Sequence, residues 1–218
     1  AAARLKAQDC EVIGLFMKNW EEDDDVEYCA AREDLAMAER VAEVLDIPLK
    51  TVNFAHEYWE RVFAIFLREY EAGRTPNPDV LCNREIKFKV FVDYAKLLGA
   101  DLIATGHYAR TERSAGGTAL LKGTDESKDQ SYFLFATTKK QLDFVRFPLG
   151  SLTKDETRAV AKRHDLNVAN KPDSQDICFV PEGKYAEVVR KLRPGSIDSG
   201  NIIDVNGNVL GKHNGIID

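Results

Sequence analysis

The sequence lacks long apolar runs and has few of the residues that build metal or disulfide frameworks. No stretch approaches 18 consecutive apolar residues, which excludes a transmembrane helix. The four cysteines show no paired zinc-type spacing, and the four histidines do not cluster. The first six residues, AAARLK, lack the order of basic and apolar regions found in signal peptides. We therefore expect no membrane partner, no metal site and no disulfide framework, and we expect a cytoplasmic location.

Positive charge is scarce in the first part of the chain. Residues 1–80 hold 9 basic and 18 acidic side chains, whereas residues 81–218 hold 21 and 18. The net charge of −6 by itself argues against a nucleic-acid partner, but this asymmetry leaves the later part able to bind a polyanion. An apolar fraction of 44% with 30% charged residues is typical of a globular protein and excludes wholesale disorder.

Short apolar runs alternate with amphipathic segments. Strands are predicted over 11–18, 49–54 and 101–105, and helices over 30–46, 56–71 and 84–98. Strands that alternate with helices of this length predict an α/β fold, in which a parallel sheet carries helices on both faces. Ligands of such sheets bind beyond the carboxyl ends of the strands, so polar residues near those ends are expected to share one cleft.

The end of the chain has a different pattern. Asn206-Gly207 between alternating apolar residues predicts a β-hairpin. Thr153 and Glu156 predict a capping box that opens a basic helix. Further elements are predicted as a helix over 154–163, a strand over 176–180 and a helix over 182–193. The length of 218 residues leaves room for one large domain and a fragment, which we place at 1–180 and 181–218.

One segment combines a carboxylate and a thiol. Residues 75–83, TPNPDVLCN, contain two prolines and come directly before a predicted helix. A cysteine near a helix N-terminus favours the reactive thiolate, and Asp79 is close enough to Cys82 to accept or donate a proton. The alternative is that Asp79 only caps the helix, and the local pattern does not decide between the two. Cys10 and Cys29 are interpreted as small buried apolar side chains.

Four motifs, taken in order and spacing, resemble those of the tRNA-specific 2-thiouridylases. They are GRTPNPDVLCN at 73–83, ATGHY at 104–108, KDQSYFL at 128–134 and DICF at 176–179. The residues at 14–20 and 211–213 fit as well, so the resemblance covers essentially the whole chain. Enzymes of this family use ATP to replace the 2-oxygen of the wobble uridine of tRNA with sulfur. The resemblance implies a Rossmann-like fold of the ATP-pyrophosphatase type, ATP with Mg²⁺, tRNA as partner, and an upstream persulfide sulfur-carrier protein.

The resemblance also implies roles for individual residues. Cys178 would carry the sulfur as a persulfide, and Cys82 would resolve it, leaving a Cys82–Cys178 disulfide. Asp79 would act as general acid and base. Met17 and Gly106 would contact ATP. The residues expected to contact tRNA are Asn77, Pro78, Asp79, His107, Lys128, Asp129 and Gln130.

Several of these residues have simpler explanations. Met17 could belong to the core, Gly106 could serve a turn, and Lys128 with Asp129 could form a surface charge pair. We prefer a functional role for Gly106 and His107 because an otherwise apolar strand ends in them.

The chain also departs from the family pattern. The Ser-Gly-Gly-x-Asp-Ser loop that holds ATP phosphates in the family is missing before Ala1, and the family continues beyond Asp218 into a central domain and a β-barrel. We therefore expect a fragment that binds ATP poorly and tRNA weakly and is inactive alone. Three alternatives stay open: a non-catalytic tRNA-binding fragment, another ATP-pyrophosphatase that adenylates a small molecule, and an iron–sulfur protein with Asp79, Cys82 and Cys178 as ligands.

Overall fold

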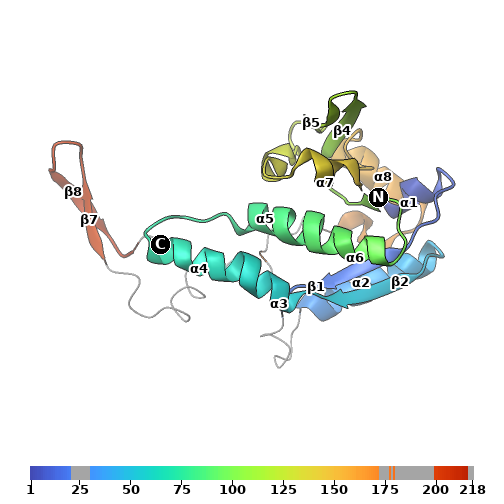
Figure 1. Ribbon diagram of the computed structural model, residues 1–218, viewed down its shortest axis with the longest axis horizontal. Helices are drawn as coiled ribbons and strands as arrows, with labels where there is room; N and C mark the ends of the chain where they lie inside the picture. The colour runs from blue at the N-terminus through green and yellow to red at the C-terminus, as the bar shows by residue number, and fades with distance from the viewer. Residues whose placement is uncertain (21–29, 172–176, 178, 180–198, 216–218) are drawn as a thin grey trace.

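A computed structural model describes residues 1–20, 30–171, 177, 179 and 199–215 (Figure 1). Its first elements are α1 (Ala2–Lys6), β1 (Gly14–Lys18), α2 (Ala30–Val44) and β2 (Leu49–Asn53). Strands β1 and β2 are parallel, and α2 makes the crossover between them. This arrangement confirms the predicted alternation, and each strand is shorter than the apolar run that predicted it.

Two long helical stretches follow and lie side by side in Figure 1. The first, which we call the support helix, consists of α3 (Ala55–Tyr58), the π-helical η1 (Trp59–Phe63) and α4 (Ala64–Glu71). The second, which we call the site helix, consists of α5 (Pro78–Leu81), the π-helical η2 (Cys82–Val90) and α6 (Phe91–Leu97). The support helix matches the helix predicted over 56–71.

The start of the site helix was predicted wrongly. The sequence placed Asp79 and Cys82 in a loop before a helix at 84–98, but the helix begins at Pro78. Asn77 is the N-cap, and its Oδ1 accepts a hydrogen bond from the amide of Val80 at 3.1 Å. Proline suits the first helical position because its φ is already helical and its missing N–H would have no partner there. Pro78 therefore starts the helix at a place where it was taken to stiffen a loop.

A second parallel pair and a hairpin complete the main body. Strands β3 (Ile103–Ala104) and β6 (Val145–Arg146) are parallel, so the strand predicted over 101–105 is confirmed in shorter form. The antiparallel hairpin of β4 (Ala109–Ser114) and β5 (Gly117–Lys122) was not predicted. Its polar sequence, with Arg, Glu and Ser on exposed positions, hides the alternation expected of a strand. The short helices η3 (Ser131–Leu134) and α7 (Lys139–Asp143) pack beside it.

The last elements largely follow the sequence. Helix α8 (Lys154–Arg163) opens with the predicted capping box and is followed by η4 (Asn167–Asn170). The predicted hairpin is formed by β7 (Gly200–Ile203) and β8 (Val209–His213), and Figure 1 shows it apart from the main body. Of the strand predicted over 176–180, only Ile177 and Phe179 are described, and neither is in a strand. The helix predicted over 182–193 lies outside the described residues.

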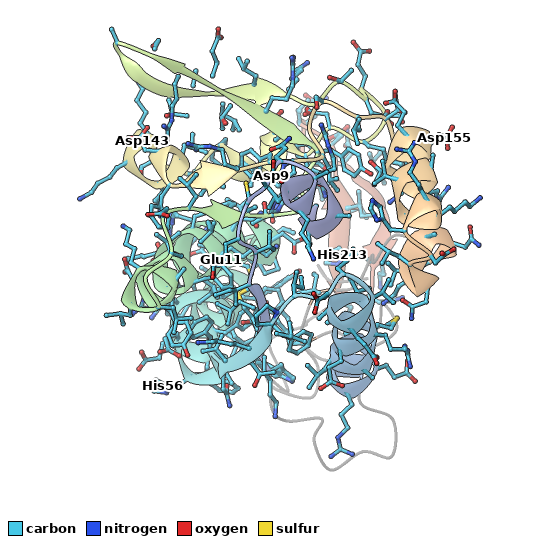
Figure 2. The ribbon with its side chains drawn as sticks, turned by 90° about the vertical axis from the view of Figure 1, so that its right-hand side faces the viewer. Asp9, Glu11, His56, Asp143, Asp155 and His213 are labelled. Atoms are coloured by element: carbon cyan, nitrogen blue, oxygen red, sulfur yellow. The ribbon has the colours of Figure 1, made fainter. Side chains whose placement is uncertain are left out.

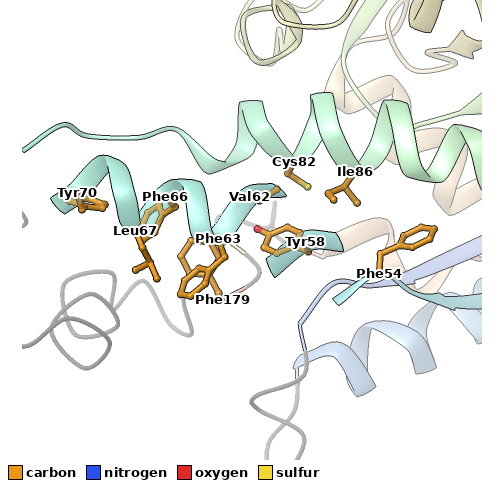
Figure 3. Packing of buried hydrophobic residues seen from close by; sticks show 10 residues of the cluster. All are labelled: Phe54, Tyr58, Val62, Phe63, Phe66, Leu67, Tyr70, Cys82, Ile86 and Phe179. Atoms are coloured by element: carbon orange, nitrogen blue, oxygen red, sulfur yellow. The ribbon is translucent and has the colours of Figure 1, made fainter. Parts of the chain in front are cut away.

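Apolar side chains form two buried clusters. The first cluster joins the support helix to the site helix and contains Phe54, Tyr58, Val62, Phe63, Phe66, Leu67, Tyr70, Cys82, Ile86 and Phe179 (Figure 3). The second cluster packs the other side of the site helix against β3, β6 and α7, through residues such as Phe88, Ile103 and Val145. Burial on both sides fixes the position of the site helix. Among the described residues, none of the helices has the length and apolar character that a membrane span needs.

Candidate active site

Cys82 lies on the buried side of the site helix. It is the first residue of the π-helical segment η2, and only 6% of its surface is exposed. In Figure 3 its side chain and that of Ile86 point from the site helix toward the support helix. π-Helical segments are rare and occur often at functional sites, since the wider turn re-aims side chains. The thiol is therefore held in an apolar seam between two helices.

The residues on either side of Cys178 pack against this same seam. Cys178 itself lies outside the described residues. Phe179 is 2% exposed, and its ring centroid is 4.8 Å from those of Phe63 and Phe66. Ile177 packs against the first cluster as well. The fold thus brings the DICF motif, by its described residues, to the cluster that contains Cys82.

A polar face of the site helix lies beside the side that carries Cys82 and Ile86. Asp79, Asn83 and Lys87 are spaced by four residues and so share one face. Protein surrounding Asp79 removes part of its hydration and raises the pKa of the carboxyl group, and the ammonium group of Lys87 acts in the opposite direction. A raised pKa suits a group that must both accept and donate a proton, as the expected role of Asp79 requires.

His107 faces this polar side from the turn after β3. Its Nδ1 and the Oγ1 of Thr105 are 2.7 Å apart. Its ring packs against those of Phe88 and Phe147, with centroids 5.8 and 5.9 Å away. Burial, together with the nearby charge of Lys87, lowers the pKa of His107 to about 3. His107 is therefore a neutral imidazole at physiological pH and can take part in hydrogen bonds without adding charge.

Asp129 and Gln130 use their side chains within the chain. The carboxylate of Asp129 accepts hydrogen bonds from the amide of Gly123 at 2.8 Å and the hydroxyl of Ser131 at 2.7 Å. Burial alone would raise the pKa of Asp129, but these hydrogen bonds outweigh it and lower the pKa. Gln130 forms two hydrogen bonds with the backbone of Tyr108. The backbone N–H of Gln130 donates to the Tyr108 carbonyl, and the Oε1 of Gln130 accepts from the Tyr108 N–H. These contacts hold the 123–131 loop against the start of β4, with Lys128 half-buried beside them.

Met17 and Gly106 both lie at the ends of parallel strands. Met17 is half-buried in β1 and packs against the first cluster, which is the core role that the sequence left open. Gly106 follows β3 and has no positive φ, and a Cβ built on it would meet only Leu149 Cδ1, at 3.8 Å. The backbone of the described chain therefore does not demand glycine at Gly106, which speaks against the turn explanation.

A cavity of about 210 Å³ has Leu149 in its lining, the residue that a Cβ on Gly106 would also meet, but Gly106 itself does not line it. Its walls come mainly from α1, α2 and α8 and are largely aliphatic. Its charged lining residues are all basic: Arg4, Lys154, Arg158 and Lys171. Lys171 already pairs with Asp34, and Arg158 Nε is buried without a partner among the described residues. The cavity thus offers apolar walls and positive charge to a ligand, and Asp79 and Cys82 are not part of its lining.

Acidic, histidine and cysteine side chains are scattered over the molecule. Figure 2 labels Asp9 and Glu11 in the segment between α1 and β1, His56 on α3, Asp143 on α7, Asp155 on α8 and His213 on β8. Across residues 1–20, 30–171 and 199–215, together with 177 and 179, no group of three or more such side chains could hold a metal ion. The proposed ligand set of Asp79, Cys82 and Cys178 cannot be formed from described residues alone, because Cys178 is outside them. Cys10, which we expected to be buried, is exposed in the turn between α1 and β1, and Cys29 lies outside the described residues.

Sequence reasoning missed two residues of the polar face, Asn83 and Lys87. Asn83 is 3% exposed, and Lys87 acts electrostatically on both Asp79 and His107. The available signal was their spacing of four and eight residues from Asp79. That signal could be used only if the helix was known to begin at Pro78.

Comparisons with known proteins identify the family of the chain. The family profile described as tRNA methyl transferase HUP domain matches residues 1–182. The tRNA-specific 2-thiouridylases MnmA of Stutzerimonas stutzeri (strain A1501) and Pseudomonas aeruginosa (strain LESB58) are each 54% identical over 217 residues, covering 100% of this chain and 57% of the relative. The enzyme of the same name from Pseudomonas putida (strain W619) is 54% identical, with 58% of its length covered. The chain therefore spans less than two thirds of the length of these relatives.

Proposed function

The chain belongs to the tRNA methyl transferase HUP domain family, a Rossmann-like nucleotide-binding fold, and from this membership we propose that it is the catalytic part of a tRNA uridine 2-sulfurtransferase. The reaction would use ATP to activate the 2-oxygen of a tRNA uridine and a cysteine persulfide to replace it. The relatives that cover the whole chain carry the name of this activity.

One observation carries the proposal: Cys82 and Phe179 belong to one buried cluster. Phe179 is covalently next to Cys178, so the two thiols of the proposed relay come from segments that the core holds together. This packing supports a pair of sulfur-transfer cysteines. An enzyme that adenylates a small molecule would have no need for such a pair.

The proposed chemistry balances atom by atom. The uracil 2-oxygen attacks the α-phosphorus of ATP and pyrophosphate leaves. The terminal sulfur of the Cys178 persulfide then attacks C2, and AMP departs with the former 2-oxygen. The Cys82 thiolate attacks Sγ of Cys178, which releases 2-thiouridine and leaves the Cys82–Cys178 disulfide. A thiol reductant must then restore both cysteines. Asp79, with its raised pKa, would move the protons beside Cys82.

The cavity bordered by α1, α2 and α8 supports the nucleotide part of the proposal. Lys154 and Arg158 provide positive charge for phosphates, and the aliphatic walls suit a purine ring. Gly106 leaves the approach to the strand end open. No described group of side chains is suited to hold Mg²⁺ by itself, so we assign the metal to the phosphates rather than to a protein site.

The tRNA would approach the polar face of the site helix. Asn77 and Asp79 are exposed there, and His107 adds a neutral polar group. The reacting carbonyl is on a nucleobase, so the base must leave its stack to reach Cys82. Lys128 would meet the RNA backbone, while Asp129 and Gln130 would hold its loop in place.

The test is sulfur incorporation into tRNA by this chain completed with the remaining segments of its Pseudomonas aeruginosa relative. Cys82→Ser and Cys178→Ser should each abolish incorporation, whereas the exposed Cys10→Ser should leave it unchanged. Full thiolation by the Cys82/Cys178 double variant would refute the relay. ATP–pyrophosphate exchange that requires tRNA would separate the enzyme from a fragment that only binds tRNA.

A further inference from the structure

Asn83 is an unusual residue for the interior of a protein. Among the described residues, the polar side chains that are almost fully buried are Asn83 and Thr118. The hydroxyl of Thr118 donates a hydrogen bond to the carboxylate of Asp143. The Nδ2 group of Asn83 has a hydrogen-bond partner, whereas its Oδ1 has none among the described residues. Asn83 directly follows Cys82 and comes four residues after Asp79.

The hydrogen bonding of Asn83 fixes which way its amide points. Its Nδ2 donates to the backbone carbonyl of Phe133 at 3.5 Å, and a carbonyl oxygen can only accept. The orientation that pairs Nδ2 with this carbonyl directs Oδ1 away from Phe133. Oδ1 is buried and has no hydrogen-bond partner among the described residues.

An unsatisfied buried acceptor is costly. Leaving such a group without a partner costs about 1–3 kcal/mol, and leucine, which has nearly the same shape, would avoid that cost. The residue directly follows Cys82 and lies one helical turn after Asp79, the two groups that would act on the base. A bound ligand that donates a hydrogen bond would satisfy the acceptor.

We propose that Asn83 determines substrate specificity by accepting a hydrogen bond, through Oδ1, from the target nucleotide of the bound RNA. The proposal rests on the proposed function. A uridine offers two neutral donors, the imide N3–H of the base and the 2′-hydroxyl of the ribose. The N3 atom of cytosine carries no proton and would repel Oδ1. If the bonded donor is the N3–H of the base, Asn83 would therefore also distinguish uridine from cytidine.

Asn83 also connects this recognition to the rest of the site. The Phe133 carbonyl belongs to η3, directly after the loop that Asp129 and Gln130 hold in place. A nucleotide that bonds to Oδ1 would thus be placed relative to both the site helix and the 123–131 loop.

The test is equilibrium binding of a short RNA stem-loop by the completed protein described above. Three probes carry uridine, N3-methyluridine or 2′-deoxyuridine at the target position. Asn83→Leu should weaken binding of the uridine probe about tenfold, the loss expected when one hydrogen bond to a buried group disappears. One of the two modified probes lacks the donor that bonds to Oδ1. The parent and Asn83→Leu should bind that probe with the same affinity. Unchanged binding of the uridine probe, or an equal loss on all three probes, would overturn the proposal.

Two further variants keep the result interpretable. Asn83→Asp retains an acceptor oxygen, and its protonated form also donates to the Phe133 carbonyl, so its affinity relative to the parent should recover as the pH falls. If the affinity of Asn83→Asp does not recover at low pH, Oδ1 does not accept the proposed hydrogen bond. If Asn83→Leu does not fold, Asn83→Asp provides the test. Asn167→Leu, at an exposed position on η4, should bind all probes like the parent. Sulfur incorporation is scored separately: its absence in the parent would refute the proposed function, while the binding ratios would still decide the role of Asn83.

Discussion

The rings of Phe63 and Phe179 pack edge to face, with centroids 4.8 Å apart and planes at 68°. Phe63 belongs to the support helix, and Phe179 follows Cys178 directly. Because Cys82 lies in the same cluster, this contact links the segments that contain Cys82 and Cys178 through the core rather than through the sequence. Anything that loosens the ring of Phe179 should therefore affect both stability and thiol pairing.

Removing this ring gives the first prediction. Phe179→Ala should lower the free energy of unfolding by about 3–5 kcal/mol, as expected for truncating a buried phenylalanine. Phe135→Ala removes a ring that is 74% exposed and should change stability by less than about 0.5 kcal/mol. Denaturant titration measures both. Under mild oxidation, Phe179→Ala should also slow formation of the Cys82–Cys178 disulfide, and an unchanged rate would mean that the cluster does not position Cys178.

The raised pKa of Asp79 predicts a pH effect on stability. The folded state binds the Asp79 proton more tightly than the unfolded state, so stability falls as the pH rises from the ordinary carboxyl range through the raised pKa. Asp79→Asn should therefore be more stable than the parent at pH 7, and the difference should shrink near pH 4. Urea denaturation at the two pH values checks this, and a variant less stable at pH 7 would contradict it. Sulfur transfer should be lost in the same variant.

His107 predicts a pH effect of the other sign. Its pKa of about 3 lies below the unfolded value near 6.5, so folding favours the neutral ring. The stability that depends on neutral His107 is present above about pH 6.5 and is lost as the pH falls toward 3. Between pH 7 and pH 5 the parent should lose up to about 2 kcal/mol more than His107→Gln. Equal losses in the two proteins would show that His107 is protonated readily in the folded state.

Two glycines give a matched pair of variants. A Cβ on Gly150 would lie 1.6 Å from the carbonyl oxygen of Ala109, so Gly150→Ala should destabilise the protein by more than about 2 kcal/mol. A Cβ on Gly106 meets only Leu149, at an ordinary contact distance. Gly106→Ala should therefore fold normally but bind ATP more weakly in the completed protein. Thermal unfolding and ATP titration separate the two effects, and unchanged ATP affinity would remove Gly106 from the nucleotide site.

The sequence predicted the elements whose signals are local. The buried strand at Gly14–Lys18, the capping box at Thr153 and the Asn-Gly hairpin were all recognised from patterns of a few residues. The hairpin at 109–122 was not, because its strands are polar and only their partners in space define them. The start of the site helix was also misplaced, since Asn77 and Pro78 fit a loop as well as a helix cap.

By itself, the sequence determined the α/β class, the family resemblance and the identity of the candidate residues, because periodicity and ordered motifs are written along the chain. Only the tertiary structure decided that Asp79, Asn83 and Lys87 share one face of the site helix, and that Cys82 beside them belongs to the same buried cluster as Phe179. It also decided that Asp129 and Gln130 bond within the chain and that Asn83 keeps a buried acceptor unsatisfied. The physical reason is that burial, hydration and hydrogen bonding depend on segments far apart in sequence, which meet only when the core is packed.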